Sequence, residues 1–213
     1  METMKVSKKL LNRLPGYLNY LKLLPPEAEY VSAPSIARAL GLGEVQVRKD
    51  LAKVSSTGRR RTGRCREELI RDIENYLDLA ADTGTVIVGT GKLGAALLDY
   101  DGFDEAGLNV MAGFDLQPTR ELTEGGKPIY PVSRLESFCE RNQVHIGVIA
   151  VPADSAQDVC DSLIACGVEA IWNFAPVRLL VPEYVIVKNE NLALSLTALR
   201  IQLKRQERQI QLN

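Results

Sequence analysis

One short stretch restricts the fold of this chain more than any other. The apolar run Val86-Ile87-Val88 passes directly into a glycine-spaced turn, Gly89-Thr90-Gly91-Lys92-Leu93-Gly94. A strand, this glycine spacing and a following helix are typical of the βαβ unit that binds a dinucleotide. Gly89 makes the tight turn, Gly91 lets the pyrophosphate approach the backbone, and Gly94 lets the helix pack on the strand. We expect the phosphates at the free N–H groups of the helix start, where the helix dipole favours anions.

An acidic residue stands at the distance that this unit requires. Asp115 lies 21 residues past Gly94 and follows the next apolar run, residues 110–114. A carboxylate there accepts hydrogen bonds from the ribose hydroxyls and repels a 2′-phosphate, which favours NAD(H) over NADP(H). Arg120 nearby weakens this preference slightly. The alternative is another nucleotide, such as the adenosine part of CoA, in the same crevice.

The surrounding pattern predicts an α/β fold with a doubly wound, Rossmann-like parallel sheet over residues 83–190, because apolar runs alternate with helical stretches. The expected strands cover residues 85–88, 110–114, 146–151, 170–173 and 184–187, and the expected helices cover 92–100, 134–142 and 155–166. Two turns, Val151-Pro152-Ala153-Asp154-Ser155 and Asn173-Phe174-Ala175-Pro176, follow expected strands. Each either lines the ligand at the carboxyl edge of the sheet or is an ordinary loop.

The first 82 residues carry helical patterns and a basic charge. Residues 10–24 predict one amphipathic helix, which Pro25 ends. Ser32 predicts the N-cap of a second helix, and Gly41-Leu42-Gly43 forms a tight turn before a third helix, residues 44–53, with Val45, Val47 and Leu51 buried. Two short helices joined by a glycine turn match a helix-turn-helix, whose second helix enters the major groove of DNA. The alternative is a three-helix bundle with a solvated basic face.

The outward face of the third helix supplies the predicted DNA readers. Arg and Lys suit guanine edges or phosphates, and Gln suits adenine. The next stretch, residues 55–64, predicts a two-stranded wing whose arginine tip fits phosphates or a narrow minor groove, although such a loop can also be merely solvated. The predicted DNA-binding residues are Gln46, Arg48, Lys49, Lys53, Arg59, Arg60 and Arg61.

Charge is distributed unevenly along the chain. Residues 1–66 hold 14 Lys and Arg against 5 Asp and Glu, whereas residues 67–213 hold 12 against 22. A basic head on an acidic body favours a polyanionic partner for the head. The four cysteines form no CxxC pair, and His145 is the single histidine, so we expect no metal site. The chain shows no signal core or membrane-length apolar run, which predicts a cytoplasmic protein.

Two observations argue against a dehydrogenase. Hydride transfer usually needs an acid or base near the carbonyl, and His145 stands at the start of a strand, away from the binding edge. No substrate domain follows residue 190. Instead, residues 191–213 predict a long helix with an apolar stripe: Leu192, Leu196, Leu199, Leu203 and Ile210, broken once by Gln206. The stripe packs either on a second subunit or within its own chain.

Together these residues resemble the Rex family of NADH-responsive transcriptional repressors. The matching segments are Arg13-Leu14-Pro15, Arg48-Lys49-Asp50-Leu51, residues 89–94, Tyr100 before Gly102-Phe103, Ala112-Gly113-Phe114-Asp115, Val151-Pro152-Ala153 and residues 173–179. The resemblance implies a winged-helix DNA-binding head, a Rossmann body, a C-terminal helix exchanged between the subunits of a homodimer, and repression relieved by NADH. The chain departs from the family pattern at residues 52–58, at Arg64, and at Asn19 and Asn191, where the family often has a charged pair.

The functional hypothesis is therefore a repressor, not an enzyme, that leaves a palindromic, AT-rich operator when NADH binds. An apolar pocket penalises the cationic ring of NAD⁺ by desolvation, which favours NADH. The predicted cofactor-binding residues are Gly89, Thr90, Gly91, Lys92, Leu93, Gly94, Asp115, Tyr100, Val151, Pro152, Phe174 and Ala175. The alternatives are an NAD-dependent oxidoreductase or a CoA-binding metabolic protein with a structural helical head, and a module that binds a protein partner.

Overall fold

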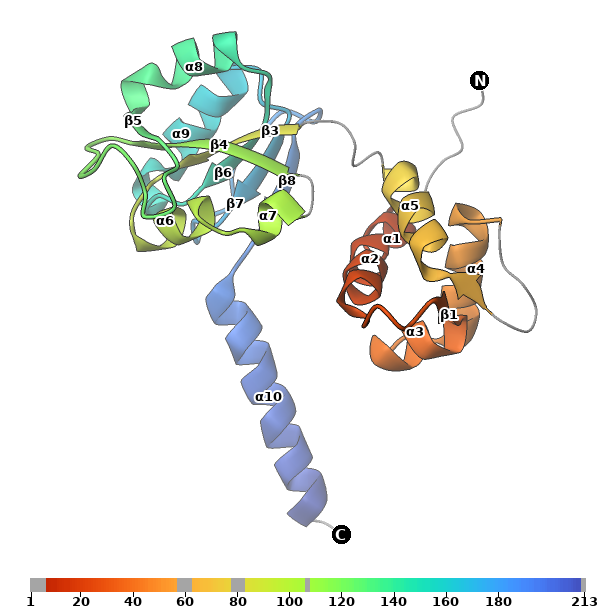
Figure 1. The fold of residues 1–213 in the computed structure, drawn as a ribbon. Coiled ribbons are helices and arrows are strands. Elements are labelled where there is room, and N and C mark those ends of the chain that lie inside the picture. The colour runs from red at the N-terminus through yellow and green to blue at the C-terminus, as the bar shows by residue number, and fades with distance from the viewer. Residues whose placement is uncertain (1–6, 57–62, 78–82, 106–107, 212–213) are drawn as a thin grey trace. The chain divides into compact units, whose positions relative to one another are not determined.

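The computed structural model describes residues 7–56, 63–77, 83–105 and 108–211. The chain forms two compact units, Met1–Ala81 and Asp82–Asn213 (Figure 1). Each unit has its own hydrophobic core. The first unit contains α1 (Lys8–Leu11), α2 (Leu14–Leu23), β1 (Tyr30–Val31), α3 (Ala33–Ala39), α4 (Glu44–Val54), β2 (Arg64–Cys65) and α5 (Arg66–Leu77).

The single helix expected over residues 10–24 is wrong, because the structure has two helices there. α1 ends at Leu11, and α2 begins at Leu14 with Pro15 in its first turn. Proline has no N–H to donate, and its ring collides with the carbonyl four residues earlier, so it is tolerated only at a helix start. The apolar spacing is nevertheless real, since Leu14, Tyr17 and Leu21 are fully buried.

The helix-turn-helix is present, with one side chain turned the other way. Ser32 caps α3, and its hydroxyl accepts a hydrogen bond from the Ser35 N–H at 3.2 Å. Gly41 joins α3 to α4 with a φ of +63°. The prediction that Val45 is buried is wrong, because 63% of it is exposed. Val47 defines the inward face of α4, and two residues of helix turn Val45 roughly 160° away from that direction.

The strand that closes the expected wing pairs with an element that sequence patterns did not predict. β2 runs antiparallel to β1, with Val31 opposite Arg64. The Arg64 guanidinium donates a hydrogen bond to the Ser55 carbonyl at 2.8 Å, which ties the end of α4 to the start of β2. Residues 57–62, and with them Arg59, Arg60 and Arg61, lie outside the described residues.

The second unit is built on a parallel sheet of six strands: β3 (Thr83–Val88), β4 (Leu108–Asp115), β5 (Ile129–Pro131), β6 (Val144–Ile149), β7 (Ala170–Asn173) and β8 (Ile186–Asn189). Their spatial order is β5-β4-β3-β6-β7-β8, and each neighbouring pair is parallel. This is the strand order of the dinucleotide-binding doubly wound fold. After β3, the chain adds β4 and β5 on one side of it and then β6, β7 and β8 on the other side. The point between β3 and β6 is therefore a topological switch point, which leaves a crevice at the carboxyl ends of the strands.

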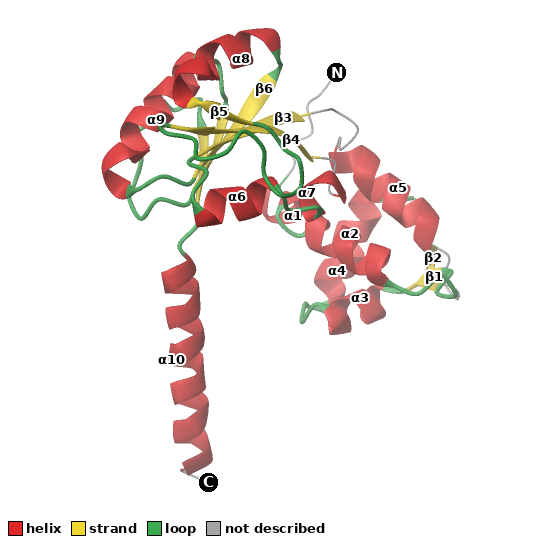
Figure 2. Cartoon of the chain, turned by 60° about the vertical axis from the view of Figure 1, so that its left-hand side comes forward, coloured by secondary structure: helices red, strands yellow, loops and turns green. Residues whose placement is uncertain are grey.

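Helices cover both faces of the sheet (Figures 1 and 2). α8 (Leu135–Arg141) and α9 (Ala153–Ala165) pack on one face, where Phe114 and Ile149 are buried. α6 (Lys92–Leu98) and α7 (Gly102–Glu105) lie on the other, over Ile87 and Val148. The expected helix 92–100 is shorter than predicted, since α6 ends at Leu98 and a separate turn of helix follows.

The last helix, α10 (Leu192–Gln211), begins at a side-chain cap, because the Asn191 carboxamide oxygen accepts a hydrogen bond from the Leu194 N–H at 2.9 Å. Every side chain described in α10, residues 192–208, is exposed. The apolar stripe therefore does not pack within its own chain over those residues. A search of the described part of the chain finds no helix long and apolar enough to cross a membrane.

Candidate functional site

The glycine turn after β3 adopts a geometry that two of its glycines make possible. Gly89 has a φ of +95°, and a Cβ there would lie 2.6 Å from the Ala150 carbonyl oxygen. A Cβ at Gly94 would lie 1.8 Å from the Gly89 carbonyl oxygen. By contrast, a Cβ at Gly91 would meet no protein atom within 4 Å. The turn is therefore packed tightly against the sheet on one side and is open at Gly91, where a phosphate has room to approach.

The Asp115 carboxylate joins the end of β4 to this turn. Its Oδ2 accepts hydrogen bonds from the Thr90 N–H at 2.7 Å and the Thr90 hydroxyl at 3.1 Å, and its Oδ1 accepts one from the Gln117 N–H at 3.2 Å. Burial alone would raise the pKa of Asp115, but these hydrogen bonds outweigh it and lower the pKa. The group is thus an anion on the wall of the cleft described below.

A cleft of about 860 Å³ opens above the glycine turn, at the switch point between β3 and β6. A volume of this size fits a cofactor or drug-sized ligand. The structure brings the following predicted cofactor residues to its wall: Gly89, Gly91, Leu93, Asp115, Val151, Pro152 and Phe174. The other predicted residues of this region do not line the cleft directly. Thr90 donates hydrogen bonds to Asp115, which does line it. Lys92 is exposed at the start of α6, and Gly94 and Ala175 are buried.

Tyr100 lies elsewhere. It lines a smaller cavity together with Asp99 and Lys127. Its ring stands edge-on to Phe103 at a centroid distance of 5.0 Å, and the residue is 59% exposed. The structure therefore does not bring Tyr100 to the cleft of its own chain.

One helical face of the cleft wall, apart from Ser155, was not predicted from the sequence. α9 contributes Ser155, Asp158, Val159 and Ser162. The spacing of these four residues, i, i+3, i+4 and i+7, places them on one helical face. This helical spacing is the sequence pattern from which the wall could have been predicted. Leu116 and Val132 complete this part of the wall, and nothing in their local sequence marks them as ligand contacts.

The apolar end of the cleft is held in place by a buried amide. Asn173 is fully buried at the end of β7. Its side-chain Oδ1 accepts a hydrogen bond from the Ala175 N–H at 3.0 Å, and its Nδ2 donates to the backbone carbonyl of Val177 at 2.9 Å. These bonds shape the turn that presents Phe174 to the cleft. The turn therefore forms part of the cleft wall through Phe174.

The outward face of α4 carries the described DNA-binding candidates. Gln46, Arg48, Lys49 and Lys53 are all exposed. Arg48 forms an ion pair with Glu44 one turn earlier. An exposed pair of this kind contributes little to stability, so it leaves the guanidinium available for exchange onto another anion.

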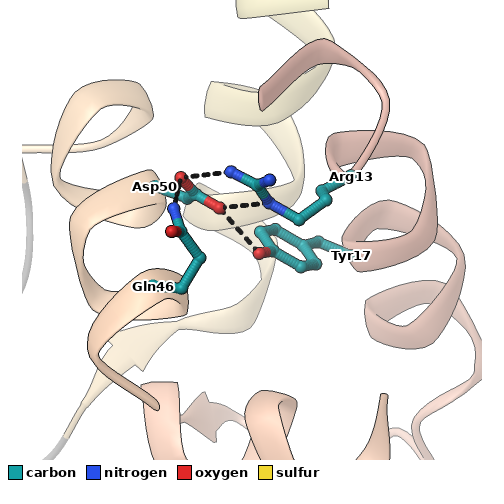
Figure 3. Close-up of polar contacts among 4 residues, drawn as sticks. All are labelled: Arg13, Tyr17, Gln46 and Asp50. Atoms are coloured by element: carbon teal, nitrogen blue, oxygen red, sulfur yellow. Dashed lines mark hydrogen bonds and ion pairs between the residues drawn. The ribbon is translucent and has the colours of Figure 1, made fainter. Parts of the chain in front are cut away.

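A buried carboxylate behind this face was not predicted as a functional residue. Asp50 is only 2% exposed and accepts hydrogen bonds from three side chains: Arg13, Tyr17 and Gln46 (Figure 3). Burial alone would raise the pKa of Asp50, but the hydrogen bonds and the charge of Arg13 lower it further than burial raises it. Asp50 is therefore a buried anion that connects α4 to α2. Arg13 is 37 residues away in the sequence, so no local pattern reveals the pair.

Metal and thiol chemistry find little support in the described part of the chain. No group of three His, Cys, Asp or Glu side chains there is close enough to hold a metal ion. The four cysteines are free thiols, with Cys139 and Cys160 buried. Burial raises the pKa of Cys139 to about 12, which suppresses its reactive thiolate.

Comparison with known proteins matches both units. Residues 5–52 match the family described as putative DNA-binding protein N-terminus, and residues 80–177 match the CoA binding domain family. Among solved structures, RSP in complex with β-NAD⁺ and operator DNA is 33% identical and gives a TM-score of 0.85, with 99% of this chain and 98% of that chain covered. RSP in complex with β-NADH is 32% identical, also with a TM-score of 0.85, over 99% and 100% of the two chains.

A curated relative from Porphyromonas gingivalis, the redox-sensing transcriptional repressor Rex, is 40% identical over 202 residues, which cover 94% of this chain and 93% of the relative. Its name is that of a regulator and not of an oxidoreductase, in agreement with the expectation that the chain is not an enzyme. By its sequence and its fold, this chain belongs to the Rex family of redox-sensing transcriptional repressors.

Proposed function

We propose that the chain is a DNA-binding repressor that senses the NADH/NAD⁺ ratio and leaves its operator when NADH binds. One observation carries the proposal above the others. The cleft at the switch point joins the glycine turn, the Asp115 carboxylate and an apolar end at Phe174, in a chain whose first unit is a helix-turn-helix. The relatives named as redox-sensing repressors support the same conclusion. Operator binding would place this activity in the cytoplasm.

The residues around the cleft fit a dinucleotide. The open side of the turn at Gly91 would take the pyrophosphate, and Oδ1 of Asp115 would accept a hydrogen bond from a ribose hydroxyl. A 2′-phosphate there would face the Asp115 anion, which favours NAD(H) over NADP(H). Thr90, Lys92, Leu93, Gly94 and Ala175 are proposed to shape the same subsites, and Tyr100 to act from outside the cleft.

The apolar end is the basis for a preference between the two redox forms. Val151, Pro152 and Phe174 offer no counter-charge to the cationic ring of NAD⁺, whereas the ring of NADH is neutral. Desolvating the cation without a partner is unfavourable. A difference of about 1.4 kcal/mol gives a tenfold preference for NADH.

The exposed stripe of α10 supports a homodimer. Leu196, Leu199 and Leu203 are each more than half exposed in the single chain, and a second copy would bury them by exchange of α10 between subunits. A two-fold dimer carries two α4 helices, which suits a palindromic, AT-rich operator. NADH would then favour a dimer arrangement whose heads do not match two half-sites.

Two titrations test the proposal. Calorimetry with NADH and NAD⁺ should give Kd values at least tenfold apart in favour of NADH. A DNA selection from a random duplex pool should recover palindromic sites without NADH and lose them at saturating NADH. Equal Kd values would remove the redox preference, and a pool that stays unenriched under both conditions would refute operator binding.

A CoA ligand is a second candidate, because residues 80–177 match the CoA binding domain family. Competition distinguishes the two. If CoA displaces NADH at comparable concentration, the cleft is not specific for the dinucleotide, whereas retention of NADH in a hundredfold excess of CoA excludes CoA as the physiological ligand.

A further inference from the structure

The recognition helix contains a glutamine whose amide is held by a buried anion. Gln46 Nε2 donates a hydrogen bond to Asp50 Oδ1 at 2.8 Å, one turn along α4 (Figure 3). A carboxylate only accepts hydrogen bonds, so the nitrogen of the amide, and not its oxygen, must face Asp50. This contact therefore decides which way round the Gln46 amide stands.

Asp50 is itself unable to turn. Arg13 binds both carboxylate oxygens, with Nε at 2.7 Å from Oδ2 and Nη2 at 2.9 Å from Oδ1. The Tyr17 hydroxyl donates a third hydrogen bond to Oδ2 at 2.8 Å. With Gln46, each oxygen accepts two hydrogen bonds, which is its ordinary capacity. Bidentate pairing fixes the plane of the carboxylate as well as its position.

We infer that Asp50 is a positioning residue for base readout, and that it sets Gln46 to recognise adenine and to reject guanine. The remaining amide oxygen and second N–H of Gln46 form an acceptor beside a donor. Adenine presents the complementary pair in the major groove, the N6 amino donor and the N7 acceptor, whereas guanine presents two acceptors, O6 and N7. To accept guanine, Gln46 would have to turn its oxygen toward the Asp50 anion.

This inference rests on the proposed binding of DNA by α4, and the test separates the two. A duplex pool is selected without NADH on the full chain and on the variants Gln46→Ala, Asp50→Asn and Tyr17→Phe. Gln46→Ala should lose an adenine-over-guanine preference of roughly 5- to 150-fold at one position of each half-site. Asp50→Asn should lose or invert the preference at that same position and leave the others unchanged, because an asparagine amide can donate to the Gln46 oxygen and turn the amide round. Tyr17→Phe, which keeps the Asp50 contact to Gln46, should retain the preference.

Three outcomes overturn the inference while leaving operator binding intact. In the first, Gln46→Ala changes the preference at no position. In the second, Asp50→Asn keeps the adenine preference that Gln46→Ala removes. In the third, Asp50→Asn weakens binding equally for all sequences, as a purely structural role predicts. If the original chain selects no DNA at all, the proposed function fails instead.

Base analogues provide a measurement that does not depend on how well Asp50→Asn folds. The adenine at the position read by Gln46 is replaced by purine, by 7-deazaadenine or by hypoxanthine in a duplex bound by the original chain. Purine and 7-deazaadenine each remove one partner and should both weaken binding. Hypoxanthine places an acceptor at position 6, opposite the fixed amide oxygen, so it should bind more weakly than purine. Equal or tighter binding of hypoxanthine would show that the amide turns freely, which overturns the inference.

Discussion

The Asp115 carboxylate accepts two hydrogen bonds from Thr90, one from its N–H at 2.7 Å and one from its hydroxyl at 3.1 Å. The residue expected to select the ribose is thus also a brace for the glycine turn. β4 and the turn after β3 meet at this point because the two strands are parallel neighbours, with Val88 opposite Phe114. The carboxylate that we propose to bind the ribose therefore also holds the glycine turn in shape.

Replacing Asp115 with asparagine should weaken NADH binding. The loss of hydrogen bonds to a charged acceptor costs about 1.5–3 kcal/mol, which corresponds to roughly a 10- to 150-fold rise in Kd. Discrimination against NADPH should fall at the same time, because the negative charge is gone. Calorimetry with both nucleotides measures this, with Glu140→Gln on α8 as a control that should bind normally. An unchanged Kd would exclude Asp115 from the site.

Replacing Arg13 with methionine should destabilise the first unit. Removal of one partner from a buried ion pair costs about 3–5 kcal/mol, and we expect the lower end because 24% of the Arg13 side chain is exposed. The control Arg38→Met, on the exposed face of α3, should change stability little. Thermal unfolding followed by circular dichroism measures both variants, and equal midpoints would contradict a stabilising role for the pair.

The ion pair between Arg13 and Asp50 makes the stability of the first unit depend on pH in the acidic range. The pKa of Asp50 is lower in the folded state than its ordinary value of 3.8. Its contribution is therefore fully present above pH 3.8 and is lost as the pH falls through the folded-state pKa. In Arg13→Met the effect of burial should dominate and raise that pKa, so acid unfolding should begin at higher pH. Unfolding curves between about pH 3 and 7 would show the displacement, and superimposable curves would refute it.

Tyr17 should govern stability at the alkaline side. Burial, followed by its hydrogen bond to Asp50, raises the pKa of Tyr17 to about 12 from 10.0. The contribution of the protonated Tyr17 hydroxyl to stability is fully present below pH 10 and is lost as the pH rises through the folded-state pKa of Tyr17. An ultraviolet titration of phenolate should show that Tyr17→Phe removes a late transition. Loss of an ordinary transition near pH 10 instead would place Tyr17 in solvent.

The basic face of the head should determine the salt dependence of DNA binding. Each phosphate contact contributes about 0.9 to the slope of log K against log salt. Lys49→Ala with Lys53→Ala should therefore reduce the slope by up to about two per head, and alanine at Arg59, Arg60 and Arg61 by up to about three. Arg141→Gln, in the second unit, is the matched control. A slope that does not change would remove these residues from the interface.

The apolar stripe of α10 should hold the dimer together. Leu199→Lys with Leu203→Lys places two cations where we propose an apolar interface, so the protein should sediment as a monomer and lose affinity for a palindromic site. Gln202→Lys, on the same helix, adds charge outside the stripe and should remain dimeric. Analytical ultracentrifugation distinguishes the outcomes, and a dimer that persists in the leucine variant would place the interface elsewhere.

Some features of this protein could be predicted from the sequence because they depend on neighbours along the chain. The glycine spacing from Gly89 to Gly94 specifies the turn that the structure contains, and Ser32 caps α3 as expected. The apolar runs located five of the six strands of the parallel sheet. The strand of this sheet that was not predicted, Ile129–Pro131, has only three residues at the sheet edge, and so short a segment carries no alternation to detect.

Tertiary structure decided the features that depend on residues far apart in the sequence. Asp50 looks like one more surface charge until α2 brings Arg13 and Tyr17 against it. Likewise, Asp158 and Ser162 become part of the cleft wall only because the fold brings α9 to the same cleft as Asp115. Helix and strand periods report which face of an element is buried, but not which side chain of another element meets it. The sequence by itself therefore determined the two kinds of unit and their turns, while the contacts across the folded chain decided which polar groups act together.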